Sequence, residues 1–141
     1  MGCFNSIVIN APSHKVWKVL KDFHDLSWSK NVVTDVKPIG GKSSNEVGAK
    51  RILNGLFHET LLSINNDDHK FTYSIDDGPG AVSKDNVEEY IGEVTVYAVT
   101  DNDISFVLWT SKWKSTKEGG VADFCNPIYH ALLQDLKGHF S

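Results

Sequence analysis

Residues 121–140, VADFCNPIYHALLQDLKGHF, repeat apolar side chains at steps of three and four. That spacing places seven of them on one stripe of an α-helix, namely Val121, Phe124, Cys125, Ile128, Leu132, Leu136 and Phe140. A proline inside a helix removes a hydrogen bond, so we expect the regular helix to begin near Asn126, with Pro127 in its first turn. Almost everything before this stretch has strand character. The sequence therefore predicts one long helix that buries its apolar stripe against a sheet.

The chain before this helix predicts one strand, two short helices and then six strands. Ser13 is the expected cap of the first helix, and residues 26–29 form the second. Asn54-Gly55 predicts a tight turn between two strands. Short connections favour antiparallel pairing. The predicted fold class is α+β, a seven-stranded curled antiparallel sheet wrapped around a long C-terminal helix, in a single domain over residues 1–141. The expected strands are 4–10, 32–39, 48–53, 57–64, 71–75, 87–100 and 104–114.

Composition narrows the class of partner. The net charge is -4 and no basic run interleaves with aromatic residues, so nucleic acid is not an expected partner. Cys3 and Cys125 are far apart in sequence and are interpreted as reduced thiols, so we expect a cytoplasmic protein. No apolar run is long enough to predict a transmembrane segment. We expect a monomer or weak homodimer. Residues 1–6, MGCFNS, match an N-terminal acylation pattern, but an ordinary start of the first strand is the favoured interpretation.

Several motifs carry a resemblance that covers nearly the whole chain. The opening IVINAPSHKVWKVLKDFHDLSWSK, the block GAKRILNGLFHETLLSINNDDHKFTYSIDDGP, Tyr90 within VEEYIGEVTV and Trp109 within FVLWTSKW occur in one order. Together they resemble the Bet v 1-like, START-like (SRPBCC) helix-grip superfamily, including its polyketide cyclase/dehydrase and lipid-transport domains. The resemblance implies a hydrophobic ligand cavity between the sheet and the last helix. It does not identify the ligand, because the superfamily binds lipids, hormones, polyketides and alkaloid precursors.

Glu59 is the sharpest candidate for chemistry. It lies mid-strand on the same face as Phe57 and Leu61, and a carboxylate on an inward face needs a partner or a raised pKa. One interpretation is a structural ion pair with Arg51 or Lys50. The resemblance implies another, because the matching position of plant hormone receptors with this fold lines the ligand cavity. An acid/base role is the third alternative.

The other candidates are mostly aromatic. Tyr73 and Tyr90 either line the cavity or are core tyrosines, and both are weaker catalytic candidates beside Glu59. Arg51 is the only arginine and would pair with Glu59, bind a ligand acid group or lie on the surface. Which face of the 104–114 strand points inward is left open by the pattern. The full set of expected ligand contacts is Trp28, Arg51, Phe57, Glu59, Leu61, Phe71, Tyr73, Tyr90, Val94, Trp109, Phe124, Ile128 and Leu132.

The loop over residues 76–83 contains two glycines and a proline and is expected to form a mobile rim. It lacks the Ser-Gly-Leu-Pro gate of the hormone receptors, so their function is not carried over. No histidine or cysteine spacing predicts a metal site, and no nucleotide or nucleophile motif occurs, so we expect neither a metal nor a cofactor.

Three functions are compatible with these patterns. The first is binding of a small or medium hydrophobic molecule, such as a lipid, polyketide or aromatic or isoprenoid metabolite, with the polar side chains setting its orientation. The second is a cofactor-independent cyclase, aromatase or dehydratase, in which Glu59 moves a proton and a tyrosine polarises a carbonyl. The third is a protein-interaction module whose cavity is filled.

Overall fold

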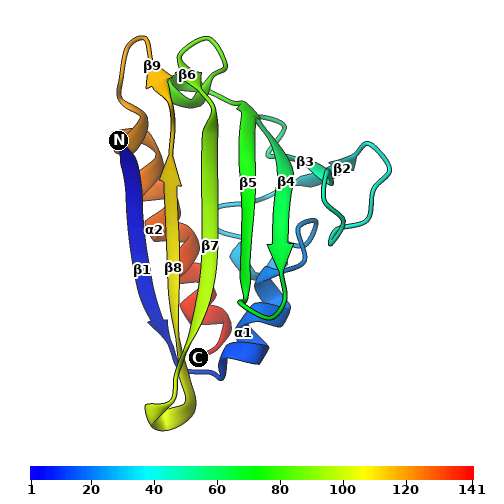
Figure 1. The fold of residues 1–141 in the computed structure, drawn as a ribbon, viewed down its shortest axis with the longest axis vertical. Coiled ribbons are helices and arrows are strands. Elements are labelled where there is room, and N and C mark those ends of the chain that lie inside the picture. Colours follow the sequence, from blue (N-terminus) through cyan, green and yellow to red (C-terminus); the bar gives the residue numbers. More distant parts are fainter.

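Seven strands pair antiparallel into one sheet in the order β1-β8-β7-β5-β4-β3-β2, in a computed structural model that describes residues 1–141. Helix α2 (Val121–His139) lies behind the sheet and packs along β1 (Figure 1). Helix α1 (Ser13–Leu20) covers the lower end of the sheet (Figure 1). The predicted helix-grip fold is confirmed. The strand bounds are β1 Gly2–Ile9, β2 Val36–Ile39, β3 Lys50–Leu53, β4 Phe57–Asn65, β5 Lys70–Asp77, β7 Tyr90–Val99 and β8 Ile104–Lys112.

Short elements complete the chain and correct several predicted boundaries. The predicted strand 87–100 divides, because Glu89 has a φ of 55° and interrupts the extended backbone. Its outer piece, β6 (Val87–Glu88), forms a separate two-stranded sheet with β9 (Ser115–Thr116). The predicted strand 104–114 ends at Lys112, and β9 lies beyond its predicted end. The predicted second helix is a single 3-10 turn, η1 (Ser27–Ser29). Two further turns are η2 (Gly80–Val82) and η3 (Asp101–Asp103).

Three predictions about local structure near the first helix and the third strand were wrong. Ser13 is the first residue of α1 instead of its cap, and no side chain caps that helix. The predicted strand 32–39 begins only at Val36, because residues 32–35 are held in an irregular segment by the side chain of Asn54. The predicted strand 48–53 begins at Lys50. The Asn54-Gly55 turn is present, with positive φ at both residues as such a turn requires.

Helix α2 begins at Val121, so the expected start near Asn126 was wrong. Pro127 lies inside the helix, where its missing N–H removes one backbone hydrogen bond. The burial of Val121 and Cys125, at 2% and 3% exposure, ties the preceding turns to the core and offsets that loss. The helix ends at His139, with Phe140 as its cap.

Strand β4 is irregular at the point where it approaches the interior. Its pairing with β5 shifts register between His58 and Glu59 and again between Leu61 and Ser63. Such bulges bend a strand and increase the local twist. Glu59 and Leu61, which lie on the same face of β4, are both buried. The irregular strand therefore carries a carboxylate into the space under α2.

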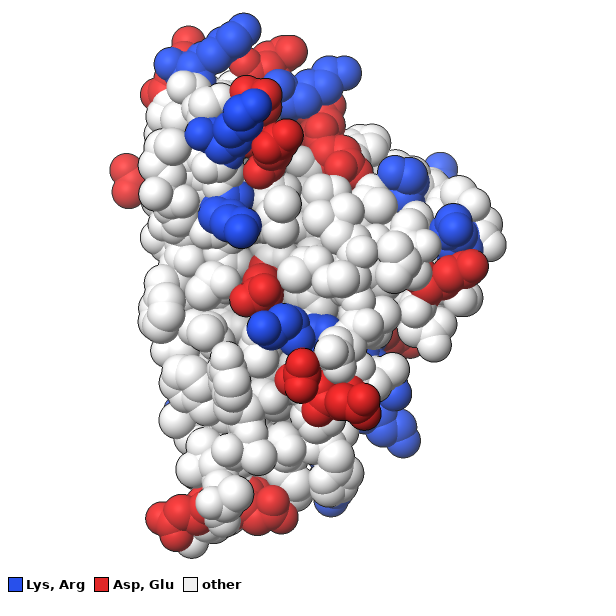
Figure 2. Space-filling view, viewed as in Figure 1, with Lys and Arg blue, Asp and Glu red and all other residues white.

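Charged side chains lie mainly on the surface. On the face shown in Figure 2, basic and acidic residues intermix at the top, across the middle and on the right of the view, and acidic residues gather at the lower tip. Two exposed ion pairs are Lys114–Glu88 at 3.5 Å and Lys50–Asp76 at 4.0 Å, and the second spans from β3 across β4 to β5. The Arg51–Glu59 pair differs from both because its side chains are 4% and 6% exposed. Ionic chemistry inside the fold is confined to that pair.

Candidate functional site

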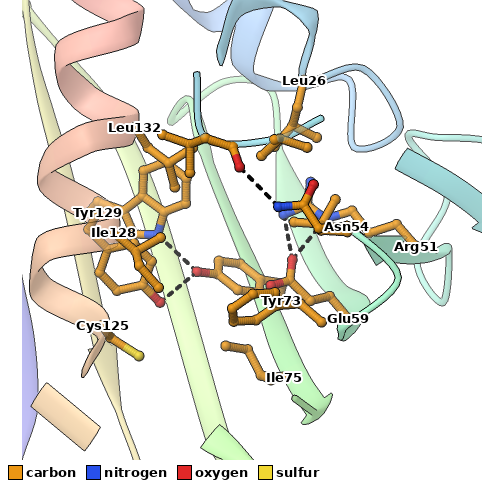
Figure 3. A pocket seen from close by; sticks show the side chains of 15 residues that line it. Leu26, Arg51, Asn54, Glu59, Tyr73, Ile75, Cys125, Ile128, Tyr129 and Leu132 are labelled. Atoms are coloured by element: carbon orange, nitrogen blue, oxygen red, sulfur yellow. Dashed lines mark hydrogen bonds and ion pairs between the residues drawn. The ribbon is translucent and has the colours of Figure 1, made fainter. Parts of the chain in front are cut away.

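A small cavity lies between the inner face of the sheet and α2. Its volume is about 50 Å³. It is mainly apolar, and its polar groups come from one end of β3, the middle of β4 and β5, and α2 (Figure 3). The lining residues are Leu26, Val32, Val33, Arg51, Leu53, Asn54, Phe57, Glu59, Tyr73, Ile75, Trp109, Cys125, Ile128, Tyr129 and Leu132.

The structure brings seven of the thirteen expected ligand contacts to the cavity wall: Arg51, Phe57, Glu59, Tyr73, Trp109, Ile128 and Leu132. Trp109 is buried, which makes its face of β8 the inner one.

The other six lie around the cavity without lining it. Phe71 packs against Trp17 and Phe23, near the lower end of the sheet. Tyr90 stacks on Trp113 at 5.8 Å, on the far side of Tyr129. Three more, Leu61, Val94 and Trp28, are buried in the surrounding core, and Phe124 is half-buried against Phe57.

Tyr129 is the most important cavity residue that the sequence pattern missed. It follows Cys125 by four residues and precedes Leu133 by four, so the helical spacing placed it on the buried stripe. Ile75 had a comparable signal, because it shares a face of β5 with Tyr73. No periodic signal pointed to Val32, Val33 or Asn54, because these residues reach the cavity from irregular segments.

A buried ion pair forms one wall of the cavity. Arg51 Nη2 and Nε lie 2.7 and 2.8 Å from the same oxygen of Glu59, Oε1 (Figure 3). Arg51 Nη1 also donates to the carbonyl oxygen of Phe23 at 2.8 Å, and the guanidinium carbon lies 3.8 Å from the centre of the Phe23 ring. Cross-strand pairing of Arg51 with Glu59 in β3 and β4 sets this geometry. The structural ion pair considered from the sequence is therefore present, and the surface position considered for Arg51 was wrong.

Burial controls the protonation of Glu59. Removal from water raises the pKa of the Glu59 carboxyl above its ordinary value, and the Arg51 guanidinium opposes part of that rise. The wall thus contains one cation and one carboxyl group whose proton affinity is increased.

Three tyrosines and a tryptophan form a second polar group beside the ion pair. Trp109 Nε1 donates to the hydroxyl of Tyr73 at 2.9 Å, and that hydroxyl lies 2.9 Å from the hydroxyl of Tyr129. Tyr129 also shares a short hydrogen bond with Tyr90. The rings of Trp109 and Tyr129 stack at 5.1 Å. Helix α2 and strands β5, β7 and β8 are therefore joined by one hydrogen-bonded chain.

These hydroxyls are neutral donors at physiological pH. Burial raises the pKa of Tyr73, Tyr90 and Tyr129 above 10, so none of them ionises near pH 7. Burial likewise raises the pKa of the Cys125 thiol to about 11. Polarisation of a bound ligand by neutral hydroxyls is the chemistry that this arrangement allows, and a thiolate nucleophile is not available.

The segment from Ser29 to Asp35 covers the cavity and is held from two sides. Asn54 Oδ1 accepts from the backbone N–H groups of Thr34 and Asp35 at 2.8 and 3.2 Å, and Asn54 Nδ2 donates to the carbonyl oxygen of Val32 at 2.9 Å. On the other side, the Asp135 carboxylate of α2 accepts from Ser29 Oγ and from Asn31 Nδ2. These side-chain bonds are exposed or part-buried and lie outside the strand ladders, so the segment can move without breaking the pairing of the sheet.

No cluster of histidine, cysteine or acidic side chains has the arrangement of a metal site. None of the helices combines the length and the hydropathy that a membrane span requires.

Comparisons with known proteins agree with the fold. The family described as polyketide cyclase/dehydrase and lipid transport matches residues 5–140. A solved structure of a protein from Nitrosospira multiformis is 36% identical, with a TM-score of 0.95 over 100% of this chain and 97% of that one. The protein XoxI of Bacillus cereus is 20% identical, with a TM-score of 0.80 over 99% and 94% of the two chains. A protein from Bacillus thuringiensis is 21% identical, with a TM-score of 0.80 over 99% and 98%. No curated protein matches the chain.

Proposed function

Because the chain belongs to the polyketide cyclase/dehydrase and lipid-transport family, we propose that it binds a small hydrophobic molecule between the sheet and α2. The observation that carries this proposal is the cavity itself, in which twelve of the fifteen lining residues are hydrophobic. Burial of apolar ligand surface supplies the affinity, at about 25 cal/mol per Å². The Arg51–Glu59 pair and the tyrosine hydroxyls orient the ligand.

The size of the cavity limits how the ligand binds. About 50 Å³ holds only a few water molecules, whereas a cavity of about 150 Å³ holds benzene and drug-sized ligands need roughly 300–1,000 Å³. Binding of even one aromatic ring therefore requires the wall to move. Displacement of the Ser29–Asp35 segment, with rotation of Leu132 or Ile128, enlarges the space without breaking the sheet. The ligand-free protein is accordingly a closed form that opens for its ligand.

Replacing Leu132 by tryptophan tests the location of the site. The indole fills the cavity between α2 and Trp109, so we expect loss of binding of small aromatic molecules, with at least tenfold weaker affinity by calorimetry. Overpacking costs about 1–3 kcal/mol of stability, which leaves a folded protein to assay. His130→Trp on the exposed side of α2 is the matched control and should bind normally. Unchanged affinity in Leu132→Trp would locate the ligand elsewhere.

A second function, a cofactor-independent cyclase or dehydratase, is favoured by one feature of the same cavity. Glu59 has a raised pKa and an oxygen that no protein group occupies, and Tyr73 supplies a neutral hydroxyl on the same cavity wall. A carboxylate that removes a proton and a hydroxyl that polarises a carbonyl are the two groups that an intramolecular condensation or dehydration needs. The ion pair with Arg51 weakens Glu59 as a base, which is why ligand binding is the first proposal.

Glu59→Gln separates the two functions. If the protein is such an enzyme, turnover of a poly-β-ketone substrate should fall by at least about a hundredfold, because general-base catalysis contributes that much. Glu93→Gln removes a carboxylate from β7 outside the cavity and should keep full turnover. Equal turnover in wild type and Glu59→Gln would exclude Glu59 as the proton-transfer group.

A further inference from the structure

One of the two carboxylate oxygens of Glu59 makes no hydrogen bond within the protein. Oε1 accepts both bonds from Arg51, whereas Oε2 has no hydrogen-bond partner. Only two side-chain polar atoms are both fully enclosed and without a hydrogen-bond partner, and these are Ser111 Oγ and Trp113 Nε1. Oε2 also lacks a partner but is not among them, so it is not fully enclosed and faces open space. Because Glu59 is only 6% exposed and lines the cavity, the space that Oε2 meets is the cavity. The cavity therefore presents a carboxylate oxygen that lacks a donor.

The cavity has no cation left for an acidic ligand. Arg51 is the only arginine of the chain, and no lysine or histidine lines the cavity. Three nitrogens of Arg51 already bond to Glu59 and to the carbonyl oxygen of Phe23, and the guanidinium lies over the Phe23 ring. A ligand carboxylate would lose its hydration and stand beside Glu59 without a free bidentate partner.

The tyrosine chain has one hydroxyl proton more than it uses. Three hydroxyls, those of Tyr73, Tyr90 and Tyr129, share two hydrogen bonds, and Trp109 fills an acceptor site of Tyr73 with its own N–H. Each hydroxyl donates only one proton, so one of the three protons has no acceptor among the three hydroxyls. When the hydrogen bonds run toward Tyr90, that proton meets the Ser111 and Cys125 side chains, and when they run the other way it is carried by Tyr73. A ligand oxygen next to Tyr73 or Tyr129 favours the arrangement in which this surplus proton points into the cavity. The cavity thus offers both an acceptor and a neutral donor. The Glu59 oxygen repels an anion, and a single neutral hydroxyl does not replace the cation that a buried anion needs.

We propose that the cavity selects neutral hydroxyl-bearing aromatic ligands of the phenol class and rejects carboxylates such as fatty acids. This inference rests on the proposed binding function. The ligand hydroxyl donates to Glu59 Oε2, a charge-assisted bond of the strong type. The surplus tyrosine proton bonds to a ligand oxygen, and the ligand ring packs among Trp109, Phe57 and Ile128.

Three small probes test this selectivity by isothermal titration calorimetry at pH 7 on the native chain. p-Cresol and p-xylene have nearly the same shape and differ by a hydroxyl in place of a methyl group, and 4-methylbenzoate carries the anion. We expect p-cresol to bind about tenfold or more tightly than p-xylene, because a hydrogen bond to a charged group gives at least that factor, and 4-methylbenzoate not to bind. Water-to-protein transfer alone would favour p-xylene, so the order of the two affinities is decisive.

The outcomes separate this inference from the function on which it rests. If p-xylene binds at least as tightly as p-cresol, or 4-methylbenzoate matches p-cresol, the selectivity is overturned and cavity binding stands. If neither neutral probe gives a heat that Leu132→Trp abolishes, cavity binding itself is contradicted, and the selectivity with it. Glu59→Gln should reduce the preference for p-cresol severalfold, whereas Glu93→Gln should retain it. The native-chain comparison decides the matter even where Glu59→Gln fails to fold.

Discussion

Glu59→Leu should lower the free energy of unfolding by about 3–5 kcal/mol at neutral pH, because it leaves the Arg51 guanidinium buried without a counter-ion. The carbonyl oxygen of Phe23 and the Phe23 ring remain as partners of Arg51, and they do not neutralise its charge. Urea denaturation followed by circular dichroism measures the loss.

Arg51→Met should destabilise the protein increasingly as pH rises, and this pH dependence identifies the buried pair. Without Arg51, burial and the Asp76 charge act on Glu59 unopposed, so the pKa of its carboxyl in the folded state rises further above the ordinary value of 4.5. Between those two pKa values the folded state holds a proton that the unfolded state has released, so stability falls as pH rises through that window. The deficit relative to wild type should be smallest near pH 4.5 and should grow toward neutral pH.

The exposed Lys50–Asp76 pair supplies the matched control for this experiment. Its side chains are 47% and 44% exposed, so Lys50→Met should cost at most about 1 kcal/mol. The double variant Arg51→Met/Glu59→Leu removes both charges and should be less destabilised than the sum of the single changes. Additive losses, or a Glu59→Leu deficit as small as that of Lys50→Met, would contradict the assignment of a dry ion pair.

Gly92→Ala should cause the second large loss of stability, because the Tyr73 ring packs directly against the backbone of Gly92. A Cβ atom at residue 92 would overlap the Tyr73 ring at Cζ and Cε1 and would lie 2.5 Å from the hydroxyl oxygen. The ring must move, and with it the acceptor of Trp109 Nε1 and the partner of the Tyr129 hydroxyl. Overpacking together with broken buried hydrogen bonds gives an expected loss of about 2–5 kcal/mol in the free energy of unfolding.

Gly138→Ala is the control, and it should change the free energy of unfolding in the opposite direction. A Cβ atom at residue 138 meets nothing within 4 Å, and the residue lies in the last turn of α2. Alanine has the higher helix propensity, so this variant should gain up to about 1 kcal/mol. Indole N–H resonances provide a structural readout, since the Trp109 resonance should shift in Gly92→Ala and stay fixed in Gly138→Ala. Full stability of Gly92→Ala with an unshifted Trp109 would show that the tyrosine chain does not depend on this close approach.

Periodicity predicted the fold because the sheet and the last helix bury their faces in regular patterns. Alternation along residues 57–64 and 71–75 placed Glu59, Tyr73 and their neighbours on the inner face, as observed. The errors lie where a single backbone conformation or side chain decides local structure. The positive φ of Glu89 and the hydrogen bonds of Asn54 leave no periodic signal, so the division of the 87–100 strand and the irregular 32–35 segment were missed.

The candidate site was less predictable, because a cavity depends on which inward side chains fail to fill the space between them. Leu61, Phe71 and Val94 share the inner face with Glu59 and Tyr73, and only the placement of α1 and its aromatic neighbours decides that they are core. Tyr129 was within reach of the helical spacing. Its contact with Tyr73 and Tyr90 joins residues 56 and 39 positions apart, which no pattern within one element predicts.

Methyl NMR during titration with p-xylene tests the claim that a ligand binds in the cavity between the sheet and α2. We predict saturable shifts of the methyl groups that line the cavity, those of Leu53, Ile75, Ile128 and Leu132, while the exposed methyl groups of Val8 and Val47 stay unchanged. The shifts should disappear in Leu132→Trp. Unchanged cavity methyl resonances up to the solubility limit of p-xylene, or shifts confined to Val8 and Val47, would contradict the claim.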